Sequence, residues 1–349
     1  MTWDALLRTP VESLLPADGM LSRNRTHPFR LWADAAEERQ ERRLLLSWAS
    51  GCSTAWLLAN SGEEADAVSA TRYVDALTRR LAWEPVAYIV GSAGFFGLDF
   101  FVTPDVLIPR PETELLVEVV SAHLDSLVRE GLRLGCGPEP LGHPADSACA
   151  RAASRLHDGV AAPGRPEARA CVQGAVAGAP RMLDVGTGSG CISVTLLRRH
   201  PQLDVTALDI SPGALAVARR NAAHHGVDGR ICFLEGDLLA IEGQALRPPY
   251  DIVVSNPPYI PAAEIGTLMP DVRCHEPRGA LDGGVDGLVF YRRLAALAGV
   301  LLRPGGLLAV EIGWDQGEDV PALFRDAGLD PVLHRDLEGR ARVVAAVLR

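Results

Sequence analysis

The most informative stretch of the chain is residues 181–199, RMLDVGTGSGCISVTLLRR. An apolar run, a glycine-rich turn and an amphipathic segment follow one another without a break, which predicts a strand, a tight turn and a helix. Short apolar runs and amphipathic segments keep alternating as far as residues 342–348. This alternation predicts an α/β fold with a doubly wound sheet whose strands are buried on both faces. Ligands of such sheets lie at the carboxyl ends of the strands.

The composition narrows the class of protein. A chain of 349 residues has room for about two domains, and its 48% hydrophobic and 22% charged residues are typical of a folded protein. The net charge of −10 offers no general basic surface for the phosphate backbone of a duplex. Seven scattered cysteines without a CxxC pair, and an N-terminus without a signal-peptide layout, indicate a cytoplasmic protein with neither a metal site nor a disulfide framework.

The first part of the chain predicts a small helical domain over residues 1–92. Residues 35–49 and 64–82 have helical periodicity. The uncharged stretch 44–60 is too short and too often interrupted by polar residues to cross a bilayer, so we expect a buried helix and turn there. No membrane partner is therefore expected.

The second domain is expected over residues 93–349. It opens with GFFGLDFFV at 94–102, which predicts a hairpin, and Pro111 followed by two glutamates predicts the start of a helix. Residues 131–180 are dense in Gly, Pro and Ala with few large apolar side chains. This composition predicts a flexible insertion within the domain.

The glycine-rich turn, residues 186–190, has glycine at every second position. Glycine lets the backbone turn sharply and lets a ligand approach it closely, so the turn suits a dinucleotide, a nucleoside or tight turning alone. The third glycine of the GxGxxG dinucleotide fingerprint is replaced by Cys191, which favours a nucleoside without a pyrophosphate, such as S-adenosylmethionine. The predicted cofactor contacts in this turn are Gly186, Thr187, Gly188, Ser189 and Gly190.

Two acids follow the next two predicted strands. Asp209 ends TALD, where a carboxylate can accept hydrogen bonds from ribose hydroxyls. The alternative role of capping the following helix is better filled by Ser211 and Pro212. Asp237 lies in LEGDLL after the third strand, where it or its neighbouring backbone meets an adenine amino group. The alternative for Asp237 is an ordinary acid on a surface loop.

The fourth predicted strand ends in VVSNPPYI, residues 253–260. Asn256 precedes a proline and is therefore extended, and two successive prolines fix φ and remove two N–H donors. The result is a rigid Asn-Pro-Pro corner (residues 256–258) whose carbonyls, beside the Asn256 amide oxygen, match the two hydrogens of an NH2 group. Tyr259 offers a flat face for a planar amide or base.

This corner suits methyl transfer to an amide or aromatic-amine nitrogen. Such a nitrogen is a poor nucleophile because its lone pair is delocalised. Acceptors that disperse the developing N–H charge, with a sulfonium methyl held in line, lower the barrier. The predicted catalytic residues are Asn256, Pro257 and Tyr259, and Pro258 completes the substrate-binding set. Asn256 is also predicted to contact the cofactor.

Together these motifs resemble the class I methyltransferases that modify amide or exocyclic amino nitrogens, and the flanking sequence narrows the resemblance. Five further stretches are similar to the release-factor glutamine methyltransferases, the HemK/PrmC family: residues 84–102, 106–118, 276–294, 311–317 and 336–344. The resemblance implies a Rossmann-like fold with a mostly parallel seven-stranded sheet. It also implies methyl transfer from S-adenosylmethionine to the side-chain amide nitrogen (N5) of the glutamine in the GGQ tripeptide of peptide-chain release factors.

The resemblance also implies roles around the cofactor. The glycine-rich turn passes under the methionine part, and Asp209 holds the ribose. Leu238, beside Asp237, lines the adenine pocket, where many relatives have an aromatic residue. Phe96 and the turn from Arg110 to Glu114 resemble the family's wall over the cofactor, without individual roles.

On the substrate side, the resemblance implies that Asn256 and the Pro257 carbonyl take the two hydrogens of the glutamine amide, with Tyr259 against its plane. The helical domain would help to dock the release factor. The insertion at 131–180 departs from the family, in which a short link occupies this place.

Three other functions compete with this interpretation. An N6-adenine or other amino-nitrogen methyltransferase acting on RNA or DNA uses the same kind of corner on a flipped base. It would need a basic groove with aromatic side chains, which a net charge of −10 and 5% aromatic residues do not favour. A non-catalytic binding module is disfavoured by the intact corner and Asp209. A nicotinamide oxidoreductase is disfavoured by the missing third glycine.

Overall fold

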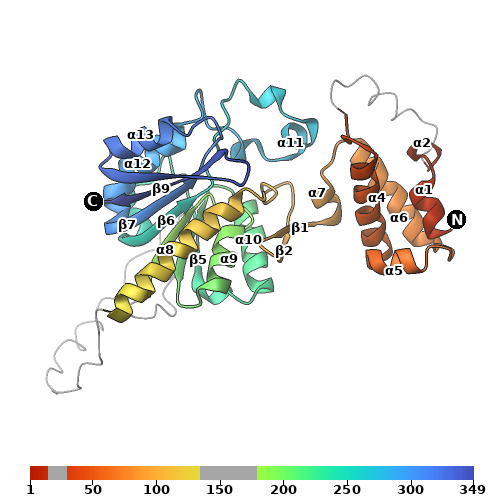
Figure 1. Cartoon of the computed structure of the whole chain (residues 1–349), viewed down its shortest axis with the longest axis horizontal. Coiled ribbons are helices and arrows are strands. Elements are labelled where there is room, and N and C mark those ends of the chain that lie inside the picture. The colour runs from red at the N-terminus through yellow and green to blue at the C-terminus, as the bar shows by residue number, and fades with distance from the viewer. Residues whose placement is uncertain (15–29, 134–178) are drawn as a thin grey trace, which may run out of the picture.

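The computed structural model describes residues 1–14, 30–133 and 179–349. In Figure 1 the N-terminal helices, coloured red to orange, gather at one end of the molecule, and a central sheet with helices on both faces forms the larger part. A short helix and a two-stranded hairpin join the two parts. Of the flexible insertion predicted at 131–180, residues 134–178 lie outside the described residues.

The N-terminal helices pack around a core of their own, which includes Trp3, Leu45, Tyr73 and Leu77. The buried Arg42 holds this group together, because its guanidinium donates hydrogen bonds to the Tyr73 hydroxyl and to two backbone carbonyls of the first helical turns. The helices predicted at 35–49 and 64–82 are confirmed as α4 and α6. The helices of this part are α1 (Trp3–Arg8), α2 (Val11–Leu14), α4 (Ala35–Ser50), α5 (Thr54–Ala59), α6 (Ala67–Leu81) and α7 (Val86–Val90).

The sheet has seven strands in the order β5-β4-β3-β6-β7-β9-β8. β9 is antiparallel to both of its neighbours, and the other neighbouring pairs are parallel. The doubly wound, mostly parallel seven-stranded fold is therefore confirmed. The strands are β3 (Arg181–Val185), β4 (Asp204–Asp209), β5 (Ile231–Glu235), β6 (Tyr250–Ser255), β7 (Leu302–Glu311), β8 (Leu329–Arg335) and β9 (Ala341–Leu348).

Both faces of this sheet are covered, which explains the apolar runs in its strands. Met182 of β3 packs in the cluster formed with α8, α9 and α10, whereas Leu183 and Val185 pack on the other side with α12 and α13. Figure 1 shows α8, in yellow, crossing one face. The helices are α8 (Thr113–Arg133), α9 (Cys191–Arg199), α10 (Pro212–His224), α11 (Pro270–His275), α12 (Val289–Leu301) and α13 (Asp319–Asp326), and the 3-10 turns are Asp228–Arg230, Gly243–Leu246, Ile265–Thr267 and Arg278–Ala280.

The predicted hairpin is confirmed as β1 (Ser92–Phe95) and β2 (Leu98–Phe101). Asn221, a buried residue of α10, fixes this hairpin beside the glycine-rich turn. Its Oδ1 accepts a hydrogen bond from the Phe101 N–H at 2.8 Å, and its Nδ2 donates to the carbonyls of Phe101 at 3.0 Å and Ser189 at 2.8 Å. One side chain therefore satisfies three backbone groups from two separate segments.

Two further observations bear on the sequence-based expectations. Among the cysteines of the described residues, Cys52, Cys191 and Cys274 are free, whereas Cys232 is disulfide-bonded, although the sequence predicted no disulfide framework. Within residues 1–14, 30–133 and 179–349, no helix is long and apolar enough to span a membrane.

We expect Asn221→Ala to destabilise the part of the chain that contains the seven-stranded sheet. The substitution leaves a buried N–H and two carbonyls without this partner, and the loss should lower the free energy of unfolding by about 2–4 kcal/mol. Urea unfolding of the purified chain measures the change. Asn60→Ala is the matched control, because the Asn60 amide bonds only the Trp56 carbonyl at an exposed site, and a change below about 0.5 kcal/mol is expected. Equal effects of the two substitutions would contradict the proposed role of Asn221.

Candidate active site

A cavity of about 400 Å³ lies at the carboxyl ends of β3, β4, β5 and β6. Its walls are the turns that follow these strands, the segment 105–113 that leads into α8, and the segment 277–282 that precedes α12. The sequence predicted a ligand at this edge of the sheet, and the cavity volume is in the range of small-molecule sites. The described residues contain no cluster of three or more His, Cys, Asp or Glu side chains suited to a metal ion.

The glycine-rich turn forms the floor of the cavity through residues 186–189. Gly186, Gly188 and Gly190 have φ values of 70°, 55° and 78°, in the left-handed region that favours glycine. Gly190 does not line the cavity. A Cβ on it would lie 3.2 Å from the Ala218 Cβ, so this glycine allows α9 to pack closely against α10.

A buried carboxyl supports this turn, and no motif in the sequence predicted it. Asp184, in β3, accepts hydrogen bonds from the Thr187 hydroxyl at 2.8 Å and the Ser193 hydroxyl at 2.6 Å. Complete burial raises the pKa of Asp184 to about 6. An acid inside an otherwise apolar strand was the available signal, since a charged side chain is rarely buried without a partner.

Asp209 lines the cavity and also supports the turn. Its Oδ2 accepts from the Gly188 N–H and its Oδ1 from the Ser211 N–H, both at 2.9 Å. Ser211 caps α10, with Pro212 in the first turn, as predicted. Because a carboxylate has about four acceptor sites, Asp209 keeps lone pairs for a ligand.

The next part of the wall follows β5. Asp237 and Leu238 both line the cavity, beside Leu208 and Leu239. The Oδ1 of Asp237 accepts from the Leu239 N–H at 2.8 Å, which shapes the turn. The wall is mostly apolar here, so it suits a flat ring with a polar edge.

The Asn-Pro-Pro corner follows β6, the neighbour of β3, and lines the cavity with all three of its residues. The Asn256 Nδ2 donates a hydrogen bond to the Thr113 hydroxyl at 3.1 Å. No hydrogen bond among the described residues engages its Oδ1, which is the atom needed to accept from a substrate. The preceding Ser255 fixes the end of β6 by donating to the Val185 carbonyl at 2.7 Å.

Tyr259 lies differently from the expectation. It is not among the described residues that line the cavity, and its ring packs in part against the core beside α12. Its backbone carbonyl accepts a hydrogen bond from the Gln316 Nε2 at 3.2 Å. A Cβ on Gly287, whose φ is 75°, would lie 2.3 Å from the Tyr259 carbonyl oxygen, so only glycine allows this close packing behind the corner.

The segment 105–113 forms another part of the cavity wall. Arg110 lines the cavity and forms an ion pair with the buried Glu276, which also accepts from the Ile108 N–H at 3.3 Å. Burial raises the pKa of Glu276, and the nearby Arg110 opposes this shift. Phe96 does not line the cavity, because it lies in the hairpin turn, where its N–H donates to Glu114 Oε1 at 2.7 Å.

Comparisons with known proteins agree with this geometry. The PrmC N-terminal domain model matches residues 30–91, and the methyltransferase small domain model matches residues 173–270.

Named relatives match over most of the chain. A release factor glutamine methyltransferase of Moorella thermoacetica is 40% identical over 325 residues, which cover 92% of this chain and 95% of that protein. Proteins of the same name from Geobacter sulfurreducens and Caulobacter vibrioides are 38% and 39% identical, covering 88% and 87% of this chain and 88% of each relative. Identity at this level along nearly the whole length shows that the chain belongs to the release factor glutamine methyltransferase family.

Proposed function

We propose that this chain transfers a methyl group from S-adenosylmethionine to the side-chain amide nitrogen of the glutamine in the GGQ tripeptide of peptide-chain release factors. The observation that carries the proposal is that the Asn-Pro-Pro corner and the glycine-rich turn line one cavity. The names of the relatives support the substrate.

The cofactor occupies the sheet edge. The glycine-rich turn lies under the methionine part, and Asp209 accepts hydrogen bonds from the ribose hydroxyls. Asp237 and Leu238 border the adenine. Cys191 also lines the cavity, and burial raises the pKa of its thiol to about 12, so this thiol stays neutral and does not compete for the methyl.

The substrate amide enters at the corner. The Asn256 Oδ1 and the Pro257 carbonyl accept its two N–H hydrogens, and Pro258 keeps the corner rigid. The amide nitrogen would attack the methyl carbon as the bond from that carbon to sulfur breaks. S-adenosylhomocysteine would leave, and the methylated nitrogen would release one proton to water. The acceptors disperse the positive charge that develops on the N–H groups during this step. We assign Tyr259 to supporting the corner, because its ring packs against the core.

The partner is the release factor, and the helical N-terminal part is available to dock it. Because this substrate acts in translation, we propose that the enzyme is cytoplasmic. An RNA or DNA substrate is the alternative, and the net charge of −10 argues against it.

Removing the corner amide tests the chemistry. We expect Asn256→Ala to lower kcat on a release factor by roughly a thousandfold, because one of the two acceptors is lost from the transition state. The dissociation constant of S-adenosylmethionine, measured by calorimetry, should change by less than about threefold. Methyl incorporation from labelled cofactor measures kcat. A variant that methylates normally would exclude the acceptor-pair mechanism.

Removing the ribose acceptor tests the cofactor site. We expect Asp209→Ala to weaken S-adenosylmethionine binding by about 10- to 100-fold, because hydrogen bonds to a charged group contribute about 1.5–3 kcal/mol. Asp228→Ala removes the same charge from an exposed turn and should leave the affinity unchanged. Calorimetric titration of both variants gives the comparison, and equal affinities would place the ribose elsewhere.

A competition experiment tests the substrate. The enzyme is incubated with labelled cofactor, a release factor and total RNA, and mass spectrometry identifies the molecule that gains the methyl. Label on the glutamine of the GGQ tripeptide supports the proposal, and its loss when that glutamine is replaced by alanine is the control. Label on RNA alone would refute it.

A further inference from the structure

A buried carboxyl lies behind the Asn-Pro-Pro corner, and the mechanism above does not use it. Glu311 is the last residue of β7 and is 1% exposed. Strand pairing places it there, because Ser255 of β6 pairs with Val310 of β7, and Asn256 and Glu311 are the next residues along.

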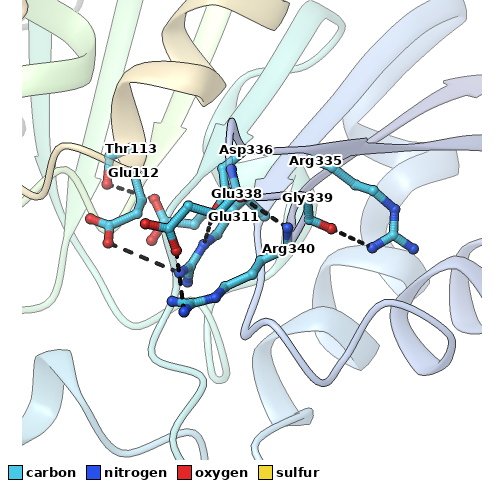
Figure 2. Close-up of polar contacts among 9 residues, drawn as sticks. Glu112, Thr113, Glu311, Arg335, Asp336, Glu338, Gly339 and Arg340 are labelled. Carbon is cyan, nitrogen blue, oxygen red and sulfur yellow. Dashed lines mark hydrogen bonds and ion pairs between the residues drawn. The ribbon is translucent and has the colours of Figure 1, made fainter.

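Hydrogen bonds connect this carboxyl to the corner. The Thr113 hydroxyl bridges the two, and a hydrogen bond from the Asn256 side chain also lowers the pKa of Glu311. Figure 2 shows the Thr113 side chain, at the start of α8, bonded to Glu311, and the hydroxyl donates to Glu311 Oε2 at 2.6 Å. The Asn256 Nδ2 donates to the same Thr113 oxygen at 3.1 Å. Thr113 is 2% exposed, so water does not replace these contacts readily.

The direction of these bonds determines which end of the Asn256 amide faces the cavity. A hydroxyl has one hydrogen, and an ionised carboxylate can only accept. Thr113 therefore gives its hydrogen to Glu311 and offers lone pairs alone to Asn256. The amide must turn its NH2 toward Thr113, which leaves Oδ1 for the substrate nitrogen.

Protonation of Glu311 removes this selection. A protonated carboxyl can donate to Thr113, which frees the hydroxyl hydrogen to bond Asn256 Oδ1. The amide is then as well accommodated when rotated by 180°. In that orientation it presents N–H donors to the substrate NH2 group, which cannot accept them.

The cost of the buried charge also points to a function. A carboxyl removed from water lowers stability unless it is well compensated, and an amide of the same shape would fill the space without that cost. A negative charge at this place additionally favours the positive charge that develops on the attacking nitrogen.

We infer that Glu311, acting through Thr113, is a positioning residue that holds the Asn256 amide with Oδ1 toward the substrate nitrogen, and that it does so only when ionised. The inference rests on the proposed function for its kinetic consequence. The orientation of the amide itself can be tested without substrate.

The groups around Glu311 determine the pH at which it ionises. Burial is the main cause that raises the pKa of Glu311 to about 7, and Glu112 raises it further. The Thr113 hydrogen bond, Arg342 and a hydrogen bond from the Asn256 side chain lower it. Arg342 is held by Asp336 at 2.9 Å and approaches Glu112 at 4.0 Å. The other titratable groups close to Glu311 are Cys191, Tyr259 and Tyr291, all with raised pKa values.

The sign of the pH effect follows. Glu311 is ionised above pH 7 and protonated below it, so kcat should fall as the pH is lowered through about 7. In Glu311→Gln no group ionises at this place. We therefore expect kcat to be about tenfold lower at pH 8 and to lose this pH dependence.

The Thr113 variants separate positioning from folding. Thr113→Val removes the hydroxyl and keeps the shape, and we expect kcat to fall by about 10- to 100-fold with unchanged affinity for S-adenosylmethionine and unchanged KM for the release factor. Thr113→Ser should restore most of the rate. Glu118→Gln, an exposed carboxyl on α8, is the matched control for charge removal and should keep the wild-type pH profile.

The amide orientation is measured by NMR in the chain without substrate. The Asn256 side-chain NH2 resonance, assigned by its absence in Asn256→Ala, should shift with a midpoint near pH 7 in the wild type and show no such shift in Glu311→Gln. A wild-type resonance that does not titrate, or a Thr113→Val enzyme with wild-type kcat, would overturn the inference. Failure of the wild type to methylate a release factor would refute the proposed function and leave the NMR test decisive. If Glu311→Gln fails to fold, the comparison of kcat between Thr113→Val and Thr113→Ser tests the inference.

Discussion

The hydrogen-bond ladder between β3 and its two parallel neighbours fixes the relative positions of the three central parts of the site. Val185 pairs with Leu208 on one side and with Ser255 on the other. The glycine-rich turn, the ribose acceptor and the Asn-Pro-Pro corner therefore start at the same level of the sheet. A slip of one residue in either pair would turn the following side chain to the opposite face.

Rigid packing behind the corner then makes the acceptors available without rearrangement. Two prolines limit the backbone, and the segment before α12 approaches it so closely that Gly283 and Gly287 leave no room for a Cβ. Gln316 bridges the carbonyls of Tyr259 and Gly287, both at 3.2 Å. Acceptors held in this way do not need to reorganise when charge develops on the substrate, which is how a fixed polar site lowers a barrier.

Local patterns in the sequence predicted most of the fold and the motifs that line the cavity, but not the contacts that support those motifs from behind. Strand, turn and helix signals depend on neighbouring residues, so the sheet, the hairpin and the Ser211 cap could be predicted from the sequence. The contacts of Thr113 with Glu311 join residues 198 positions apart, and no periodicity predicts such a pair. Tyr259 was expected at the cavity because it follows the prolines, but it packs partly against the hydrophobic cluster beside α12, a long-range contact that no local pattern predicts.

The buried carboxyls around the cavity lower the stability of the fold near neutral pH. Burial raises the pKa of Asp184 to about 6 and that of Glu311 to about 7. Because both hold a proton more tightly in the folded chain than in the unfolded one, each contributes its full stability only at acid pH, and that contribution is lost as the pH rises through these values. Near neutral pH these two carboxylates are therefore charged and only partly compensated. Asp184 lies behind the glycine-rich turn, and Glu311 lies behind the corner that holds the substrate amide. The hydroxyls of Thr187, Ser193 and Thr113 offset part of this cost by donating hydrogen bonds to the two carboxylates. Because these bonds have fixed directions, they also orient the groups that face the ligand.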